Sequence, residues 1–286
     1  MKNDTGIKVK RFVKKLFKRK LVIFAAILVV FFVVTAIFAP LLTPYDPYKG
    51  DFRQILAKPS LQHPLGTDET GRDVLTRIFY GARTSLMIGV VSVLISAVAG
   101  VCLGLVSAFY GGAVNIVISR LVDVMMSLPS LMLALALGMV LGRGTLSLMV
   151  ILGISTIPTY TRMMAGQVLS LKNRDYIVAE KVMGAKNGRI LLKHILPNCF
   201  SPILVLLTSN IGMTILAESS LSFLGMGINP PTASWGAMVS QGSAKLLLNP
   251  VYGIAPGFCV CLLVYGFNVL GDGLRDVLDP RLRGSL

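Results

Sequence analysis

Six long apolar runs, separated by polar segments, dominate the pattern of hydrophobic and polar positions along the chain. They cover residues 21–39, 85–109, 122–141, 146–164, 200–217 and 251–270. A helix crosses the roughly 30 Å hydrocarbon core of a bilayer with about 20 apolar residues, so each run is long enough to span. Gly89, Gly100 and Gly104 in the second run suit close helix packing in lipid, whereas Pro129 and Pro158 interrupt the third and fourth. The pattern predicts an all-α polytopic membrane protein with six transmembrane helices.

Composition and charge support this prediction and orient it. The 286 residues are 54% hydrophobic and 14% charged, against about 25% charged in soluble domains. The net charge of +15 would suggest nucleic acid in a soluble protein, but these bases lie mainly beside apolar runs. Nine of the first 20 residues are Lys or Arg, which places the N-terminus in the cytoplasm by the positive-inside rule. With six spans and both termini cytoplasmic, 20 of the 28 Lys and Arg residues fall on the cytoplasmic side.

This topology divides the chain into consecutive parts. They are a basic cytoplasmic tail (1–20), a first transmembrane helix (21–43), an extracytoplasmic segment (44–83), a five-helix core (84–273) with a cytoplasmic loop at 166–199, and a cytoplasmic tail (274–286). The extracytoplasmic segment ends with apolar positions at helical spacing, Val74, Leu75, Ile78 and Phe79. This spacing predicts an interfacial helix that leads into the second span.

Residues that could perform chemistry are few. The four cysteines lie within or next to apolar runs, and only two histidines occur, so no metal site or disulfide framework is expected. No phosphate-binding Gly-x4-Gly-Lys-[Ser/Thr] loop and no nucleophile elbow are present. The sequence therefore predicts that the chain is not an enzyme and carries no cofactor of its own.

Charges within the spans are also scarce. Arg120 and Asp123 are one turn apart and are expected to form an ion pair, with Arg162 as another possible partner of Asp123. Asp123 and Glu218 lie near span ends, where they are interpreted as interface anchors rather than as a proton relay. Because no charge is expected at the membrane midplane, the energy for transport would come from outside this chain.

The polar stretch 175–198 is the largest polar element between spans on the predicted cytoplasmic side. It reads as two short helices: Asp175 would cap the first, Gly184 would close it, and the second would run from about Asn187 until Pro197 stops it. Its large apolar residues are more numerous than a solvated loop needs: Ile177, Val178, Val182, Met183, Ile190, Leu191, Ile195 and Leu196. Something must cover them, which favours a partner over the alternative of a plain basic loop.

The same stretch resembles the cytoplasmic signature loop of bacterial ABC importer permeases, Glu-Ala-Ala-x3-Gly-x9-Ile-x-Leu-Pro. Ala179, Gly184, Leu196 and Pro197 are in register. The sequence departs from the motif at three positions, Val178, Glu180 and His194. Blocks at 63–86, 221–236 and 271–281 are similar to the dipeptide/oligopeptide (and nickel) branch of this family, and to its second, C-type permease.

The resemblance implies a type I ABC importer permease fold and an assembly in the bacterial cytoplasmic membrane. The partners would be a homologous permease, two ATPase subunits that bind ATP and Mg, an extracytoplasmic substrate-binding protein and the lipid bilayer. The substrate would be a di- or oligopeptide, with nickel, a metal chelate or glutathione as alternatives within the same architecture. A self-sufficient secondary carrier is the disfavoured alternative.

The resemblance also implies two groups of site residues. The ATPase-coupling group is Tyr176, Ala179, Glu180, Met183, Gly184, Ala185, Arg189, Leu196 and Pro197. The outer gate and docking group is His63, Gly66, Asp68, Gly71, Arg72, Asp73, Pro230, Pro231 and Trp235, for which a purely structural role is the alternative. Glu180 would pair with Lys181 or Lys186, or with a base on the ATPase.

Overall fold

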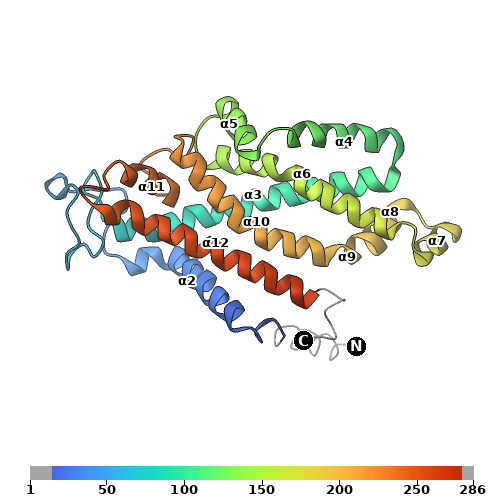
Figure 1. Ribbon diagram of the computed structural model, residues 1–286, viewed down its shortest axis with the longest axis horizontal. Coiled ribbons are helices and arrows are strands. Elements are labelled where there is room, and N and C mark those ends of the chain that lie inside the picture. Colours follow the sequence, from blue (N-terminus) through green and yellow to red (C-terminus); the bar gives the residue numbers. More distant parts are fainter. Residues whose placement is uncertain (1–14, 279–286) are drawn as a thin grey trace.

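The computed structural model describes residues 15–278, and within this range the chain is helical with connecting loops (Figure 1). The basic cluster before Lys15 and the end of the 271–281 block lie outside the described residues. The main helices are α2 (Lys20–Leu42), α3 (Val74–Tyr110), α4 (Gly112–Met126), α5 (Ser130–Leu141), α6 (Thr145–Leu171), α7 (Asp175–Val182), α10 (Phe200–Phe223), α11 (Trp235–Ser243) and α12 (Pro250–Leu278). Short turns η1 (Phe52–Gln54), α8 (Asn187–Arg189), η2 (Ile190–Ile195) and α9 (Leu196–Asn198) complete the order.

The six predicted spans are present when one bent helix pair is counted as a single span. Five helices are long and apolar enough to cross a bilayer, namely α2, α3, α6, α10 and α12. The sixth span consists of α4 and α5, whose axes differ by 94°. The break falls at Pro129, where the prediction placed it, but α4 begins at Gly112, ten residues before the predicted start. Proline removes a backbone donor and disfavours helical geometry in the residue before it, so the helix cannot continue straight.

A separate interfacial helix is absent from the part of the chain that the structure describes, and that prediction was wrong. Residues 74–83 are the first turns of α3, which runs unbroken for 37 residues. At 1.5 Å per residue this is about 56 Å, well beyond the bilayer core. Asp73 caps the helix, since its carboxylate accepts hydrogen bonds from the Thr76 amide and hydroxyl. Val74 and Ile78 are buried in a cluster with Met238 and Tyr252, so they pack against α11 and α12 rather than facing lipid.

The predicted glycine packing is confirmed, and it joins α3 to α6 and α10. A Cβ atom on Gly100 would lie 2.5 Å from the Tyr160 Cβ, and one on Gly104 would lie 2.4 Å from the Thr161 carbonyl oxygen. Gly89 meets Ile215 of α10 in the same way, at 2.7 Å. The helix backbones therefore approach each other more closely than any larger residue allows.

The bundle has two distinct ends, which we call the α7 end and the α11 end (Figure 1). The loop 43–73 and α11 gather at one, and the connection between α6 and α10 forms the other. α2 starts and α12 finishes toward the α7 end, where Arg19 forms an ion pair with Asp276. The first and last described helices thus have their outer termini on the same side of the bundle, as the predicted even number of spans requires.

Candidate functional site

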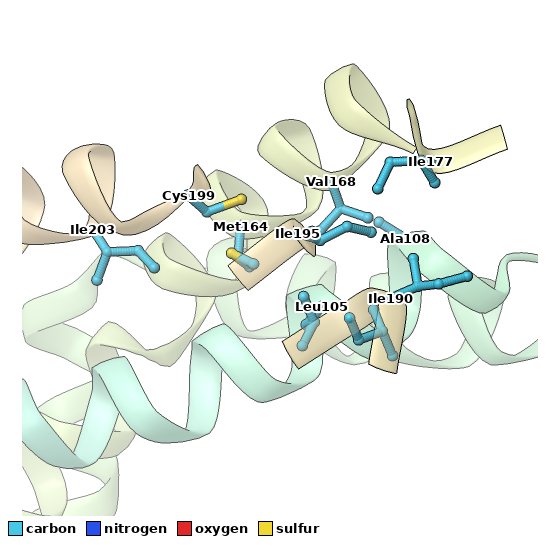
Figure 2. Packing of buried hydrophobic residues seen from close by; sticks show 10 residues of the cluster. Leu105, Ala108, Met164, Val168, Ile177, Ile190, Ile195, Cys199 and Ile203 are labelled. Atoms are coloured by element: carbon cyan, nitrogen blue, oxygen red, sulfur yellow. The ribbon is translucent and has the colours of Figure 1, made fainter. Parts of the chain in front are cut away.

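The stretch 175–198, here called the α7 segment, lies against the ends of three long helices (Figure 2). Ile177, Ile190 and Ile195 are fully buried and pack in one cluster with side chains of α3 and α6. Further members of the cluster are Leu105, Ala108, Met164, Val168, Leu191, Cys199 and Ile203. Of the eight large apolar residues that were expected to need cover, four are therefore buried within this chain, namely Ile177, Ile190, Leu191 and Ile195. The sequence did not reveal this internal cover.

Gly184 ends α7 with a left-handed backbone, φ +80°, as its position in the motif predicts. The Gly184 amide donates to the Lys181 carbonyl and the Ala185 amide donates to the Glu180 carbonyl, each at 3.0 Å. This pair of bonds is a Schellman motif, which satisfies the last carbonyls of the helix. No atom lies within 4 Å of a Cβ added to Gly184, so the requirement for glycine is conformational rather than steric.

Two predicted boundaries of the segment were wrong. Asp175 does not cap α7: Arg174 holds the N-cap position, and Asp175 lies in the first turn, where its charge favours the helix dipole. Pro197 does not end the second helix either, because α9 continues through it and leads directly into α10. The wider π turn η2 precedes Pro197. A π turn adjusts the backbone register around a residue that cannot donate a hydrogen bond.

The outer face of the α7 segment carries an exposed apolar set: Tyr176, Val178, Val182, Met183 and Leu192. Val182 is 82% exposed, Met183 74% and Leu192 66%. Of the predicted coupling residues, Ala179, Gly184, Arg189 and Pro197 are also exposed, whereas Glu180, Ala185 and Leu196 are partly buried. Apolar side chains of this size next to exposed basic residues indicate a protein-docking surface.

Two lysines tie the C-terminal end of α6 and the α7 segment to the end of α3. The Lys172 ammonium donates to the Ala108 carbonyl at 3.1 Å. The Lys181 ammonium lies 5.5 Å from the centre of the Phe109 ring, within cation–π range. A displacement of the segment would therefore act on α3 as well as on α6 and α10.

Glu180 has an intramolecular neighbour that the sequence prediction did not name. The His194 Nε2 atom lies 3.2 Å from the Glu180 Oε1 atom, although it makes no hydrogen bond. The expected pairing with Lys181 or Lys186 is therefore replaced by a contact with His194. Two of the three departures from the family motif thus face each other across the segment.

We expect Glu180 and His194 to act as a unit that holds α7 against η2. Glu180→Ala and His194→Ala should each increase hydrogen–deuterium exchange of the amides at 176–185, and the double variant should exchange no faster than either single one. The coupling energy of such a partly buried contact is about 0.5–1 kcal/mol. Additive effects of the two substitutions would contradict the pairing.

A buried ionic cluster organises the α11 end. The Asp68 carboxylate accepts a hydrogen bond from the Arg72 Nε atom at 2.7 Å and lies 3.3 Å from the Arg77 Nε atom in an ion pair without hydrogen-bond geometry. The Arg77 guanidinium also donates to the carbonyls of Pro47 and Pro231, at 3.0 and 3.2 Å. Arg77 thus joins the 43–73 loop, α3 and the loop before α11. The sequence prediction did not select it, although it lies within one of the matching blocks.

Most of the other predicted outer residues are buried and stabilise the same region at the α11 end. The His63 Nδ1 atom lies 2.9 Å from the Asp73 Oδ1 atom, and both side chains are buried. The indole of Trp235 is buried and donates to the Ile78 carbonyl at 2.9 Å. Gly66 and Gly71 have φ of +75°, and a Cβ on either would strike a backbone carbonyl. The structure brings the two predicted blocks together, but only Pro230 and Pro231 among these residues are exposed.

Arg77→Met should destabilise the protein by about 2–3 kcal/mol, because two carbonyls lose their donor and Asp68 loses one of two cations. Arg83→Met is the matched control, since Arg83 is an exposed arginine of the same helix. Thermal unfolding of the purified protein in detergent would measure both variants. Equal midpoints for the two variants would contradict the assigned role of Arg77.

Asp123 and Glu218 each differ from the first expectation for them. Asp123 pairs with Arg162 of α6 at 2.7 Å, the alternative partner named for it, rather than with Arg120, which has no acidic partner within residues 15–278. Both side chains of this pair are about half exposed, so its contribution to stability is small. Glu218 is not an interface anchor: it is fully buried and accepts hydrogen bonds from Ser85 and Ser222 at 3.2 and 2.9 Å. It thereby joins α10 to α3 within the bundle.

Comparison with known proteins agrees with this architecture. Residues 100–284 match the family described as "binding-protein-dependent transport system inner membrane component", and residues 9–62 match the N-terminal membrane domain of oligopeptide transport permease C. A dipeptide transport system permease protein of Alkalihalophilus pseudofirmus is 41% identical over 94% of this chain and 89% of its own length. An oligopeptide transport system permease protein of Bacillus subtilis is 39% identical over 92% and 87%.

Other similarities extend the comparison. A glutathione transport system permease protein of Escherichia coli is 40% identical over 91% of this chain and 86% of its own length. The inward-facing MetNI methionine ABC transporter contains a chain that superposes with a TM-score of 0.59 at 20% identity, over 72% of this chain and 97% of that one. This likeness concerns the fold alone. The matches in sequence show the family: the chain belongs to the binding-protein-dependent transport system inner membrane components, as an ABC importer permease of the dipeptide and oligopeptide branch.

Proposed function

We propose that this chain is the C-type permease subunit of an ATP-driven importer of di- and oligopeptides, with both termini and the α7 segment in the cytoplasm. The observation that carries the proposal is the exposed apolar set on the α7 segment. Its opposite face is packed against α3 and α6, and its last turn continues into α10. A surface of this kind suits a partner that pushes on the segment and moves three spans together.

The partners would be a homologous permease and two ATPase subunits that bind ATP and Mg. In this proposal Met183 and Val182 enter an apolar groove of an ATPase subunit, and the exposed bases Arg174, Lys186 and Arg189 face acidic groups around it. Closure of the ATPases then displaces the α7 segment. The buried contacts of Ile177 and Ile190 carry this displacement to the spans. ATP hydrolysis thus takes place on the partner subunits, whereas this chain performs the transport movement.

The α11 end would face the extracytoplasmic binding protein. The buried Asp68–Arg72–Arg77 cluster holds the 43–73 loop against the loop that carries Pro230 and Pro231. In this proposal the buried residues maintain the docking surface and the exposed prolines contribute to it. The alternative is that His63, Asp68, Arg72 and Asp73 are purely structural.

The substrate class rests on the relatives. Those most similar in sequence include permeases named for dipeptides, oligopeptides and glutathione, at 39–41% identity. All three are amide-containing peptides, so a peptide is the common chemistry. Glutathione is the second candidate, because its transporters are as similar in identity as the others. Nickel and metal chelates have no such relative among these.

The proposal is tested by reconstitution of the complete importer in proteoliposomes. The complex of both permeases, both ATPases and the binding protein should take up a radiolabelled di- or oligopeptide only with ATP, and this chain alone should transport nothing. Uptake by this chain alone would favour a self-sufficient carrier. ATP-dependent uptake of glutathione or nickel, without uptake of other peptides, would replace the proposed substrate class.

A further inference from the structure

A hollow of about 220 Å³ lies between three spans, α2, α3 and α12, near the start of α11. Aromatic side chains from all four elements form much of its wall: Phe32, Phe79, Phe258 and Trp235. None of the described residues that line it carries a charge. The hollow therefore differs in chemistry from both the α7 segment and the ionic cluster at the α11 end.

The polar hydrogens around the hollow are already bonded within the chain. The Thr35 hydroxyl donates to the Phe32 carbonyl at 3.0 Å, and the Trp235 indole donates to the Ile78 carbonyl at 2.9 Å. The remaining polar group among the described lining residues is the thiol of Cys259, a residue that behaves as a small hydrophobe. An apolar cavity of about 150 Å³ stays dry and takes up benzene, so the fitting occupant here is a hydrocarbon rather than water.

The hollow opens to the outside at the depth of the bilayer core. Phe31 and Phe258 line it and are also 54% and 62% exposed, so they mark its mouth. Phe31 is the middle residue of the 23-residue helix α2. At 1.5 Å per residue it lies about 16 Å from either end of that helix. Because the hydrocarbon core is about 30 Å thick, the mouth faces hydrocarbon and not the headgroups.

The surface of α2 around the mouth has the composition of a lipid-facing helix. Helices that pack together in lipid use small residues at the contact. Along α2, which the structure describes in full, every small residue is buried or partly buried: Ala25, Ala26, Thr35, Ala36 and Ala39. The exposed residues beside Phe31 are large and aliphatic, such as Ile27, Val30 and Val34. A phospholipid therefore fits this face better than a helix of the second permease.

We propose that this hollow binds an acyl chain of a membrane phospholipid, which enters between Phe31 and Phe258 and ends beside Trp235. An empty hollow forfeits dispersion contacts for the side chains on its wall, and a methylene chain restores them. Trp235 packs edge-to-face on Phe32, with ring centroids 5.2 Å apart, so the bound chain also supports the start of α11. The inference goes beyond the transport assignment and requires only that α2, α3 and α12 cross the bilayer.

A photoreactive lipid tests the site in the assembled importer. The complex is reconstituted in nanodiscs that contain phosphatidylethanolamine with a diazirine near the end of one acyl chain, and the adducts are mapped by mass spectrometry. Leu75 lines the hollow, whereas Val30 and Val34 are exposed near the depth of the mouth. Adducts at Leu75 should be at least about fourfold more frequent than at either valine, the factor gained by burying a single methylene. Equal frequencies would overturn the proposal and indicate bulk lipid only, and no adduct at Leu75 would overturn it in favour of cover by the second permease.

Ala255→Phe places a ring inside the hollow, and Ile254→Phe is the matched control. Ala255 lines the hollow, whereas Ile254 is 61% exposed and is not among the lining residues. Ala255→Phe should lower the Leu75 adducts about fourfold or more, and Ile254→Phe should leave them within about twofold of wild type. Size-exclusion chromatography shows whether each variant is folded, and the comparison within the wild-type protein decides the question if Ala255→Phe is not. Equal adduct yields in two folded variants would overturn the site.

Discussion

We expect the Gly184→Val protein to insert into the membrane at the wild-type level and to lose ATP-driven transport by about tenfold or more. At φ +80° a β-branched side chain costs about 1–3 kcal/mol. The chain avoids that strain by opening the Schellman bonds at the end of α7, which displaces Val182 and Met183 from their positions. Transport in proteoliposomes and co-purification of the ATPases are the measurements.

Gly184→Asn is the matched control for this experiment. Asparagine tolerates the left-handed conformation, so it should retain most of the transport. No atom lies within 4 Å of a Cβ added at this position, so a clash at the Cβ does not separate the two variants. Normal uptake by Gly184→Val would refute the role of the Schellman motif in coupling, and equal loss in both variants would refute the conformational explanation.

Gly104→Val should prevent the correct packing of α3 on α6, with a loss of more than about 3 kcal/mol. Its Cβ would lie 2.4 Å from the Thr161 carbonyl oxygen and 2.8 Å from the Met164 Cβ. A backbone carbonyl in a helix cannot move aside, so the two helices must separate. The expected result is little folded protein in detergent, read by size-exclusion chromatography and thermal unfolding.

Gly166→Val provides the control within α6 itself. Gly166 is exposed, and nothing lies within 4 Å of a Cβ added there. This variant should therefore behave as wild type in both measurements. Wild-type behaviour of Gly104→Val as well would contradict the close approach of α3 and α6.

Much of the fold follows from the sequence because it depends on local pattern. Apolar runs located the spans, and Gly100 and Gly104 identified a tight helix contact before α6 was known to be the partner. The continuous helix α3 was missed, since the residues 74–83 have an amphipathic spacing that fits an interfacial helix equally well. The burial of Val74 and Ile78 against α11, α12 and the 43–73 loop is a tertiary effect that periodicity does not contain.

The site was less predictable, for reasons that differ between its two ends. On the α7 segment, the signature spacing and Gly184 identified the place, but the motif does not reveal which apolar residues face inward. At the α11 end, the role of Arg77 depends on carbonyls 30 and 154 residues away in the chain. The contact of Glu180 with His194 likewise depends on how the helices meet, so neighbours in sequence were the wrong guide. For Asp123 the sequence offered both Arg120 and Arg162, and only the packing of α4 on α6 selects Arg162.

Site-specific photocross-linking from Met183 in the assembled importer tests whether the α7 segment docks on an ATPase subunit. Met183 is 74% exposed at the α7 end, and Met139 in α5, which is 77% exposed, is the control with similar exposure away from the α7 segment. We expect an adduct with an ATPase subunit from position 183 and none from position 139. Absence of an ATPase adduct at 183, or equal adducts at both positions, would contradict the assignment of the α7 segment as the ATPase-docking element.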